Sequence, residues 1–286
     1  MAGKTKNLVE LMRPFTLVYP PLAVVCGAII AIGAVTLNVF YGAVAAILLN
    51  ASSNVFNQYF DVAIDRVNKP DRPMPQNKIS NESCIGFGLY LMVVGVIFAY
   101  FASPQFLMIV IVAMLFVISY SAPPLRTKKR GLLANLTITI PRGLLPLVAG
   151  WATVASVLTL TPWLFGIVMA LFVFGATSSK DFSDIRGDRM YNVKTLPVVY
   201  GLEKTARIIA PFLVFPFLLF VPYVQLGLLA QEFILLSGLS LIGFYAAYML
   251  IRSPKEVALG KNHPSWKYMY ILMALFTVGS ALISVI

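Results

Sequence analysis

Long apolar segments alternate with short polar ones along the whole chain of 286 residues. A helix needs about 20 apolar residues to cross a bilayer, and nine segments approach that length. They lie at roughly 16–36, 38–60, 84–102, 105–121, 132–153, 162–181, 206–224, 229–251 and 267–286. The longest polar stretches, near 61–83 and 181–205, are too short for a separate soluble domain. The pattern predicts an all-α polytopic membrane protein with about nine transmembrane helices in one bundle, forming a single domain over residues 1–286.

Composition agrees with this prediction, because 59% of the residues are hydrophobic and only 12% are charged. Soluble domains contain about 25% charged residues. The net charge of +11 does not indicate a nucleic-acid partner, because the cations are divided among short loops. The N-terminal segment has no cleavable signal pattern, and we expect it to be retained. Cys26 and Cys84 lie in or beside apolar segments and are expected to be small hydrophobic residues, not a disulfide or a metal site.

The basic residues alternate with the predicted helices. The N-terminal segment and the loops after the second, fourth, sixth and eighth helices contain 21 of the 22 Lys and Arg residues. By the positive-inside rule, the N-terminus and these loops face the cytoplasm and the C-terminus lies outside. The expected location is the plasma membrane of a prokaryote, where basic loops also contact anionic membrane lipids.

Arg142 is the exception, because it lies inside the fifth predicted helix in the sequence TIPRGLLP. A cation at this depth is costly and usually faces a polar cavity or a partner. Pro141 and Gly143 flank it and predict a local bend in the helix. Arg142 is therefore either a substrate-binding residue or an arginine that snorkels or pairs for structural reasons.

Acidic residues are scarce, and six of the eleven form two clusters after the second and sixth predicted helices. They are Asp61, Asp65, Asp71, Asp181, Asp184 and Asp188. Steps of four place Asn57, Asp61 and Asp65 on one helical face, and Asp184 and Asp188 repeat the step. Both clusters are expected at the cytoplasmic side.

Like charges at this spacing repel each other by a few tenths of a kcal/mol in water, and more strongly near a membrane. Ion pairs with the nearby Lys and Arg residues could compensate, and so could a bound divalent cation. Oxygen ligands suit Mg²⁺, which often joins one or two carboxylates to substrate phosphates. Neither cluster contains His or Cys, which argues against zinc and copper.

Four segments together resemble the UbiA-type intramembrane prenyltransferases. NQYFDVAID followed by DRVNKPDRP resembles their first Asp-rich motif, NxxxDxxxD, and KDFSDIRGDRMYNVKTLPVVYG resembles the second. YSAPPLRTKKRG resembles the loop after the fourth helix, and LMRPFTL resembles the Arg-Pro that opens the first. The match covers nearly the whole chain. It implies a helical bundle around a central cavity, and transfer of a polyprenyl group from its diphosphate to an acceptor.

The resemblance also assigns residues to roles. The metal ligands carried over, holding two Mg²⁺, are Asn57, Asp61, Asp65, Asp181, Asp184 and Asp188. The residues carried over as diphosphate contacts are Arg72, Arg126, Lys128 and Lys194. Tyr120 would lie near the reacting allylic carbon, and Arg13 would contact the acceptor. Alternatives stay open: Tyr120 suits an interfacial aromatic belt, and Lys128 and Arg13 suit a purely topological role. His263 in GKNHPSW is expected to be incidental.

The chemistry agrees with these assignments. A diphosphate leaves readily only when its charge is neutralised, and the remaining allylic cation can rest against aromatic faces. The chain has 20 Phe and 13 Tyr residues to provide such faces.

The sequence leaves several acceptors open. RPMP, YSAPPLR and KDxxDxxGD…KTLPVVYG resemble the archaeal branch, which adds a second geranylgeranyl chain to geranylgeranylglyceryl phosphate. An aromatic acceptor of the hydroxybenzoate, homogentisate or naphthoate type is the alternative. A membrane transporter or carrier is the alternative of another class, although transporters usually place ionisable residues near the midplane.

Overall fold

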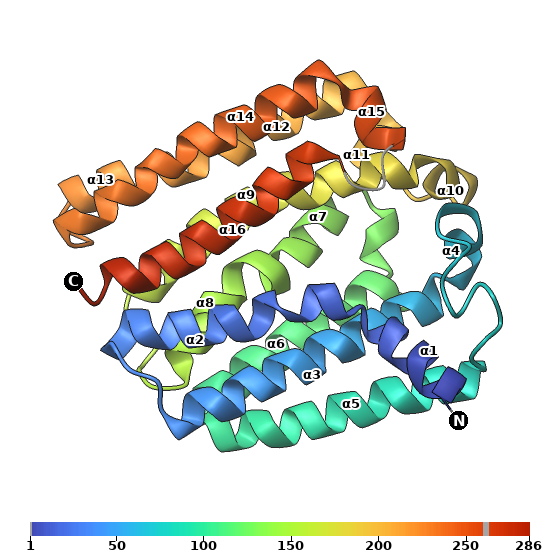
Figure 1. Ribbon diagram of the computed structural model, residues 1–286, viewed down its shortest axis with the longest axis horizontal. Coiled ribbons are helices and arrows are strands. Elements are labelled where there is room, and N and C mark those ends of the chain that lie inside the picture. The colour runs from blue at the N-terminus through green and yellow to red at the C-terminus, as the bar shows by residue number, and fades with distance from the viewer. Residues whose placement is uncertain (1, 260–262) are drawn as a thin grey trace.

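The computed structural model describes residues 2–259 and 263–286, and within these residues all regular structure is helical (Figure 1). Nine segments of the described chain are long and apolar enough to cross a membrane. They are Pro14–Ile32, Leu37–Phe60, Asn81–Ala102, Pro104–Ser121, Leu132–Ala152, Thr161–Met190, Leu202–Gln225, Gln231–Arg252 and Pro264–Ile283. The predicted fold class and number of spans are thus confirmed. The two termini lie at opposite ends of the bundle, as an odd number of crossings requires (Figure 1).

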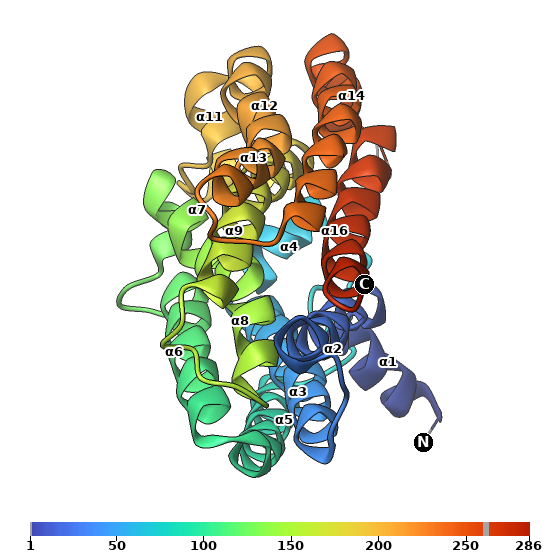
Figure 2. The ribbon, with the colours of Figure 1, turned by 90° about the vertical axis from the view of Figure 1, so that its left-hand side faces the viewer.

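The described chain forms the following helices, some within the spans and some between them. They are α1 (Ala2–Met12), η1 (Pro14–Leu17), α2 (Tyr19–Ile32), α3 (Leu37–Phe60), α4 (Val62–Asn68), α5 (Asn81–Ala102), α6 (Pro104–Ser121), η2 (Thr127–Lys129), α7 (Leu132–Thr139), η3 (Ile140–Leu144), α8 (Leu145–Ala152), α9 (Thr161–Lys180), η4 (Asp181–Asp184), α10 (Ile185–Met190), α11 (Leu196–Tyr200), α12 (Leu202–Leu218), α13 (Phe220–Gln225), η5 (Gln231–Gly238), α14 (Leu239–Arg252), α15 (Pro254–Leu259) and α16 (Pro264–Ile283). Figure 2 views the bundle from the end opposite to α4 and α10.

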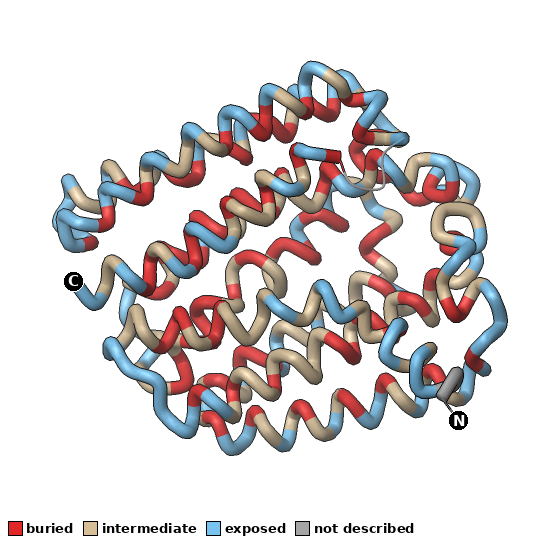
Figure 3. The backbone as a smooth tube through the Cα atoms, viewed as in Figure 1, coloured by how far each residue is buried: buried red, intermediate tan, exposed pale blue. Residues whose placement is uncertain are grey.

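The outer surface of the bundle is apolar. Leu241 and Phe244 on α14 are 75% and 66% exposed, and such residues recur along the outward faces of the helices (Figure 3). Inside, Phe165, Phe217 and Phe276 are fully buried and pack against one another. In lipid the outward faces need no burial, so association depends on close packing of the inner faces.

Small residues allow a close helix contact between α2 and α8. A Cβ atom on Gly150 would overlap the carbonyl oxygen of Val24, and one on Gly27 would overlap that of Leu147. Glycines at such positions let two backbones approach closely. This contact joins two walls of the cavity described below.

The predicted irregularity around Arg142 is a π-helical turn, η3, between α7 and α8. Pro141 lacks the backbone N–H that would continue the regular hydrogen-bond pattern. Gly143 faces α9, where an added Cβ would lie 2.7 Å from the Cα of Ala170. π-Helical turns of this kind often occur at functional sites.

A short helix that the sequence did not predict, α1, precedes the first span. Two side chains of α3 hold its C-terminal end: Gln58 Nε2 donates to the carbonyl of Leu11 at 2.6 Å, and Asn54 Nδ2 donates to that of Met12 at 2.8 Å. The chain then turns through Arg13, whose φ is 56°. Arg13 is thereby placed at the end of the bundle where α3 ends.

The two cysteines and His263 have the following positions in the described structure. Cys26 and Cys84 are free and buried. His263 caps α16, because its Nδ1 accepts from the backbone N–H of Ser265 at 3.2 Å. Its role in the described structure is that of a helix cap.

Candidate active site

The first carboxylate motif lies where α3 passes into α4. The backbone N–H of Asp61 donates to the carbonyl of Asn57 at 3.0 Å, and that of Asp65 donates to the carbonyl of Asp61 at 2.8 Å. The sequence predicted one continuous helical face. The structure instead breaks the helix at Asp61, whose φ and ψ are −106° and 7°, while the four-residue hydrogen bonds persist.

The two carboxylates of this motif are buried, and Asn57 is linked to one of them. Asp61 and Asp65 are only 8% and 4% exposed. Asn57 Nδ2 donates to Asp61 Oδ2 at 2.8 Å and to Ser121 Oγ, at the end of α6, at 3.3 Å. Ser121 therefore connects the first motif to the loop that follows the fourth span.

Two cations of that loop neutralise Asp61. Lys128 is buried and forms an ion pair with Asp61 Oδ1. Arg126 lies 3.5 Å from the same oxygen and donates to the carbonyl of Phe60 at 2.8 Å. Burial lowers the pKa of Lys128, while the neighbouring Asp61 raises it. Arg126 and Lys128 are thus brought to the motif, as the sequence predicted.

Asp65 has its own cation. Arg72 donates to Asp65 Oδ2 at 2.6 Å across the loop that follows α4. Burial raises the pKa of Asp65, although Arg72 and Lys69 oppose this effect. The guanidinium of Arg72 is therefore at the carboxylate motif, where the sequence placed it.

The second motif occupies η4 and α10. Asp184 forms an ion pair with Lys69 of the first loop. Thr195 Oγ1 donates to Asp188 Oδ2 at 3.4 Å. Asp181 is close enough to interact electrostatically with both Asp184 and Asp188, and with Lys69. The three carboxylates of this motif therefore lie within electrostatic range of one another and of Lys69.

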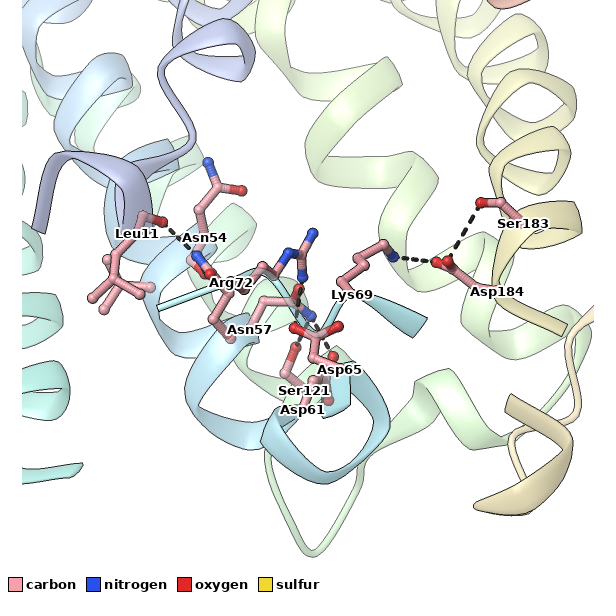
Figure 4. A network of polar contacts seen from close by, with 12 residues as sticks. Leu11, Asn54, Asn57, Asp61, Asp65, Lys69, Arg72, Ser121, Ser183 and Asp184 are labelled. Atoms are coloured by element: carbon pink, nitrogen blue, oxygen red, sulfur yellow. Dashed lines mark hydrogen bonds and ion pairs between the residues drawn. The ribbon is translucent and has the colours of Figure 1, made fainter. Parts of the chain in front are cut away.

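The loops that carry the two motifs are joined directly, as α4 and α10 lie side by side (Figures 1 and 4). Asn68 Nδ2 donates to the backbone carbonyl of Asp184 at 2.9 Å, and the backbone N–H of Gly187 donates to Asn68 Oδ1 at 2.8 Å. Lys128 interacts electrostatically with Asp188 in addition to its ion pair with Asp61. The fold thus converts two distant sequence motifs into one acidic site with a basic rim.

The residues of this site are suited to Mg²⁺ by their chemistry. Carboxylate and amide oxygens are hard ligands, and the three carboxylates of the second motif near one lysine leave negative charge for a cation to neutralise. In the described part of the chain, however, no three His, Cys, Asp or Glu side chains converge as a preformed metal site. The carboxylates of Asp61, Asp65 and Asp184 are paired with lysine or arginine instead.

Tyr120 and Arg142 lie inward of the two motifs. Tyr120 interacts electrostatically with Asp61 of the first motif, with Asp181 and Asp188 of the second, and with Arg142. Tyr120 is therefore close to both motifs at once. Arg142 makes no hydrogen bond or ion pair with any described residue.

Arg13 lies between the acidic site and Arg142. Burial, together with the neighbouring Arg72 and Arg142, lowers the pKa of Arg13 to about 10, whereas Asp65 raises it. Arg13 remains protonated at neutral pH. Its guanidinium is thus close to the place where the sequence predicted substrate contacts.

Lys194 is the predicted residue that the structure does not bring into contact with the site. It is exposed between α10 and α11, and it forms no ion pair with the described residues. Its neighbour Thr195 does reach Asp188. A diphosphate contact from Lys194 stays a prediction.

An apolar cavity of about 250 Å³ extends from the site into the bundle. Walls come from α2, α3, α6, α8, α9 and α16. Phe56 and Lys180, which line the cavity, are the sequence neighbours of Asn57 and Asp181, so the cavity ends beside both motifs. The central cavity implied by the resemblance is therefore present.

Sequence interpretation missed several residues of this region. Asn68 and Lys69 lie in the quoted stretch DRVNKPDRP, but the sequence motif assigns neither of them a role. Lys180 directly precedes Asp181 and was counted only as a loop cation. Ser121 lies in the quoted stretch YSAPPLRTKKRG without an assigned role. Tyr270, whose hydroxyl accepts a hydrogen bond from Lys180, had no local signal, because nothing around it distinguishes it from other aromatic residues of a membrane helix.

Comparison with known proteins decides the family. The model of the UbiA prenyltransferase family matches residues 18–282. This chain belongs to the UbiA prenyltransferase family. The sequence resemblance and the prediction that the chain is a prenyltransferase are thereby confirmed, and the family together with the nine apolar helices identifies an integral membrane protein.

Individual relatives within the family carry two kinds of name. The digeranylgeranylglyceryl phosphate synthase of Thermococcus sibiricus is 27% identical over 288 residues, covering 96% of this chain and 97% of that protein. The bacteriochlorophyll synthase 34 kDa chain of Chloroflexus aurantiacus is 30% identical over 209 residues, covering 70% of this chain and 66% of that protein.

Solved UbiA-type structures have the same fold. One, from a study of digeranylgeranylglyceryl phosphate synthase in membranes, has a TM-score of 0.74 at 24% identity and covers 99% of both chains. A UbiA homologue from Archaeoglobus fulgidus, bound to GPP and Mg²⁺, has a TM-score of 0.75 at 17% identity, covering 98% of this chain and 99% of that one. At these identities the likeness concerns the fold.

Proposed function

We propose that this UbiA-family protein transfers a geranylgeranyl group from its diphosphate to geranylgeranylglyceryl phosphate in ether-lipid synthesis. The observation that carries the proposal is the joining of two carboxylate motifs, through Asn68 and Lys69, beside an apolar cavity. The names of relatives such as the Thermococcus sibiricus protein support the choice of acceptor.

The metal ligands in this proposal come from both motifs. They are Asn57, Asp61, Asp65, Asp181, Asp184 and Asp188. Two Mg²⁺ held there would neutralise the diphosphate and make it a better leaving group. The Archaeoglobus fulgidus homologue bound to GPP and Mg²⁺ supports the use of a divalent metal by this fold.

The cations that now pair with carboxylates would bind the diphosphate. Lys69, Arg72, Arg126 and Lys128 already lie within reach of the motif oxygens. Charge-assisted hydrogen bonds from lysine and arginine to phosphate oxygens are strong and stabilise the charge that develops on departure. We also assign Lys194 to the diphosphate, as a residue of the same motif.

The remaining steps concern the prenyl group and the acceptor. A hydroxyl oxygen of the acceptor forms a bond to C1 of the prenyl chain as the C1–O bond to diphosphate breaks. The diphosphate keeps the electron pair of that bond, and the hydroxyl proton passes to the departing diphosphate or to water. Tyr120 lies close to both motifs, where its ring can face the developing allylic cation.

The topology in this proposal follows the distribution of the basic residues. The N-terminus and the loops carrying both motifs face the cytoplasm, and the C-terminus lies outside, with the chain acting as one domain in the plasma membrane of a prokaryote. Labelling of single cysteines introduced at Ser183 and Ser284 in sealed vesicles tests this, because only one of the two should be accessible from each side.

The function is tested with the purified protein, geranylgeranyl diphosphate and Mg²⁺. Geranylgeranylglyceryl phosphate and 4-hydroxybenzoate are supplied in parallel, with EDTA, Asp61→Asn and Asp184→Asn as controls. We expect transfer to the glyceryl phosphate that EDTA and both substitutions abolish. Transfer to hydroxybenzoate alone would overturn the proposed acceptor but would support prenyl transfer as the reaction. If no diphosphate is released with either acceptor, the proposed enzymatic function is overturned in favour of a carrier.

A further inference from the structure

The charged residues that line the cavity are both cations. Arg142 and Lys180 line it, while its lining contains no Asp or Glu among the described residues. The rest of the lining is mainly apolar, with Phe106 and Phe172 as examples. A cavity with two positive charges and no counter-charge is suited to an anionic ligand.

Lys180 is held in place by an aromatic residue, not by a carboxylate. Its ammonium group donates to the hydroxyl of Tyr270 on α16 and lies 4.7 Å from the centre of that ring. Asp181 is adjacent in sequence, yet Lys180 forms no ion pair with any described residue. Its charge therefore remains available to a molecule in the cavity.

Arg142 adds a second unpaired charge. It lies in the π-helical turn of the fifth span and has no hydrogen bond or ion pair with the described residues. An arginine inside a span is costly unless something compensates its charge. Lys180 interacts electrostatically with both Arg142 and Arg13, so the three cations repel one another in the absence of an anion.

A neutral donor lies beside this pair. The indole Nε1 of Trp266 is buried without a hydrogen-bond partner, and Trp266 also lines the cavity. Trp266 precedes Tyr270 by one turn of α16, so both residues lie on one face of that helix. A buried N–H group without a partner is exceptional in a folded chain, and Trp266 belongs to the same wall of the cavity as Tyr270.

From this arrangement we infer that Lys180 and Tyr270, with Arg142, form a binding subsite for the phosphate monoester head of the lipid acceptor. The inference rests on the proposed function and names how its acceptor is recognised. A phosphate monoester carries up to two negative charges and three acceptor oxygens, which match two lining cations with Arg13 nearby. A single carboxylate would leave positive charge uncompensated.

The position of the subsite suits transfer. Arg142 and Lys180 are on the cavity side of the carboxylate motifs, and Tyr120 interacts electrostatically with Arg142 as well as with both motifs. A phosphate bound at Arg142 and Lys180 would leave the neighbouring glycerol hydroxyl on the side of Tyr120. The donor diphosphate and the acceptor phosphate would then be bound by different cations.

The test compares two acceptors that differ only in the phosphate. Wild-type protein, Lys180→Met and Tyr270→Phe are titrated with geranylgeranylglyceryl phosphate and with geranylgeranylglycerol, by direct binding and by transfer assays. Loss of a hydrogen bond to a charged group weakens binding by about 10- to 100-fold. We expect Lys180→Met to show this loss for the phosphate-bearing lipid alone, with unchanged affinity for geranylgeranyl diphosphate. Tyr270→Phe is expected to show a smaller loss.

Lys204→Met is the matched control. Lys204 is also exposed and lies 5.2 Å from the ring centre of a tyrosine, Tyr200, but it does not line the cavity. We expect Lys204→Met to bind both lipids as the wild type does, and Lys180→Arg to retain the preference for phosphate. Retained binding of geranylgeranyl diphosphate shows that each variant is folded.

The outcomes separate this inference from the proposed function. If Lys180→Met keeps the full preference for the phosphate-bearing lipid, the subsite is overturned even when transfer proceeds. If the wild type prefers that lipid through Lys180 but transfers nothing to it, the subsite is supported and the proposed function is overturned. If 4-hydroxybenzoate binds more tightly than geranylgeranylglyceryl phosphate, and this binding depends on Lys180, the subsite does not recognise a phosphate and the inference is overturned.

Discussion

The side chain of Asn68 on α4 is hydrogen-bonded to the backbone of Asp184 in the second carboxylate motif, at 2.9 Å. The same amide accepts a hydrogen bond from the backbone N–H of Gly187 at 2.8 Å. One asparagine thus positions the second motif relative to the first. Asn68 is not one of the proposed metal ligands, so substituting it tests the positioning of the second motif without removing a ligand.

Asn68→Ala should weaken catalysis without removing a proposed ligand. Each lost hydrogen bond contributes about 0.5–1.5 kcal/mol, and two together correspond to roughly 5- to 150-fold. We expect this loss to appear as a higher Mg²⁺ concentration for half-maximal transfer, because the second carboxylate motif is no longer held in position relative to the first. Asn81→Ala, an exposed change at the start of α5, should behave as the wild type does. An unchanged Mg²⁺ titration for Asn68→Ala would contradict this role.

Gly187→Ala should disturb the same contact from the other side. A Cβ atom at Gly187 would lie 2.6 Å from the amide atoms of Asn68, which is too close for any side chain. We expect a larger loss of transfer than for Asn68→Ala, and partial recovery in the double variant, because alanine at position 68 removes the clash. Gly86→Ala, which has open space around it, is the control. Strictly additive losses in the double variant would argue against direct contact.

Asp61→Asn and Asp184→Asn should differ in stability although both abolish transfer. Lys128 and Asp61 are 7% and 11% exposed at their side chains, whereas Lys69 and Asp184 are 35% and 22% exposed. Breaking a buried pair costs about 3–5 kcal/mol, and an exposed pair is worth about 0–1 kcal/mol. Thermal unfolding in detergent should show Asp61→Asn as clearly the less stable variant. Adding Lys128→Met to it should restore part of the stability. Equal melting temperatures for the two single variants would refute the comparison.

Gly150→Ala should destabilise the bundle away from the acidic site. The added Cβ would overlap the carbonyl oxygen of Val24 and lie 2.7 Å from its Cα, and backbone atoms cannot move aside as a side chain can. Overpacking of this kind costs about 1–3 kcal/mol. We expect a lower melting temperature with little change in the affinity for Mg²⁺. Gly238→Ala, with nothing within 4 Å of the added Cβ, should melt as the wild type does.

Much of the architecture was predictable because it depends on local properties of the chain. Hydropathy over about 20 residues determines whether a helix can cross a membrane, and the nine spans follow from it. The four-residue spacing of Asn57, Asp61 and Asp65 likewise persists as backbone hydrogen bonds. Pro141 and Gly143 marked the irregular turn around Arg142, because the missing N–H of a proline disturbs the helix at that residue. The short helix α1 was missed, because it is polar and is held by Gln58 and Asn54 of α3.

By itself, then, the sequence determined the number of membrane-spanning segments, the resemblance to the family and the residue types that gather at the ends of α3 and α9. Only the tertiary structure decided which of these residues meet. Asn68 reaches Asp184 across 116 residues, and Lys180 reaches Tyr270 across 90. Pairing of Lys69 with Asp184, and of Lys128 with Asp61, depends likewise on which helices become neighbours. The physical reason is that hydropathy and helical period act within one segment, whereas partners across the bundle are set by the packing of helices against one another.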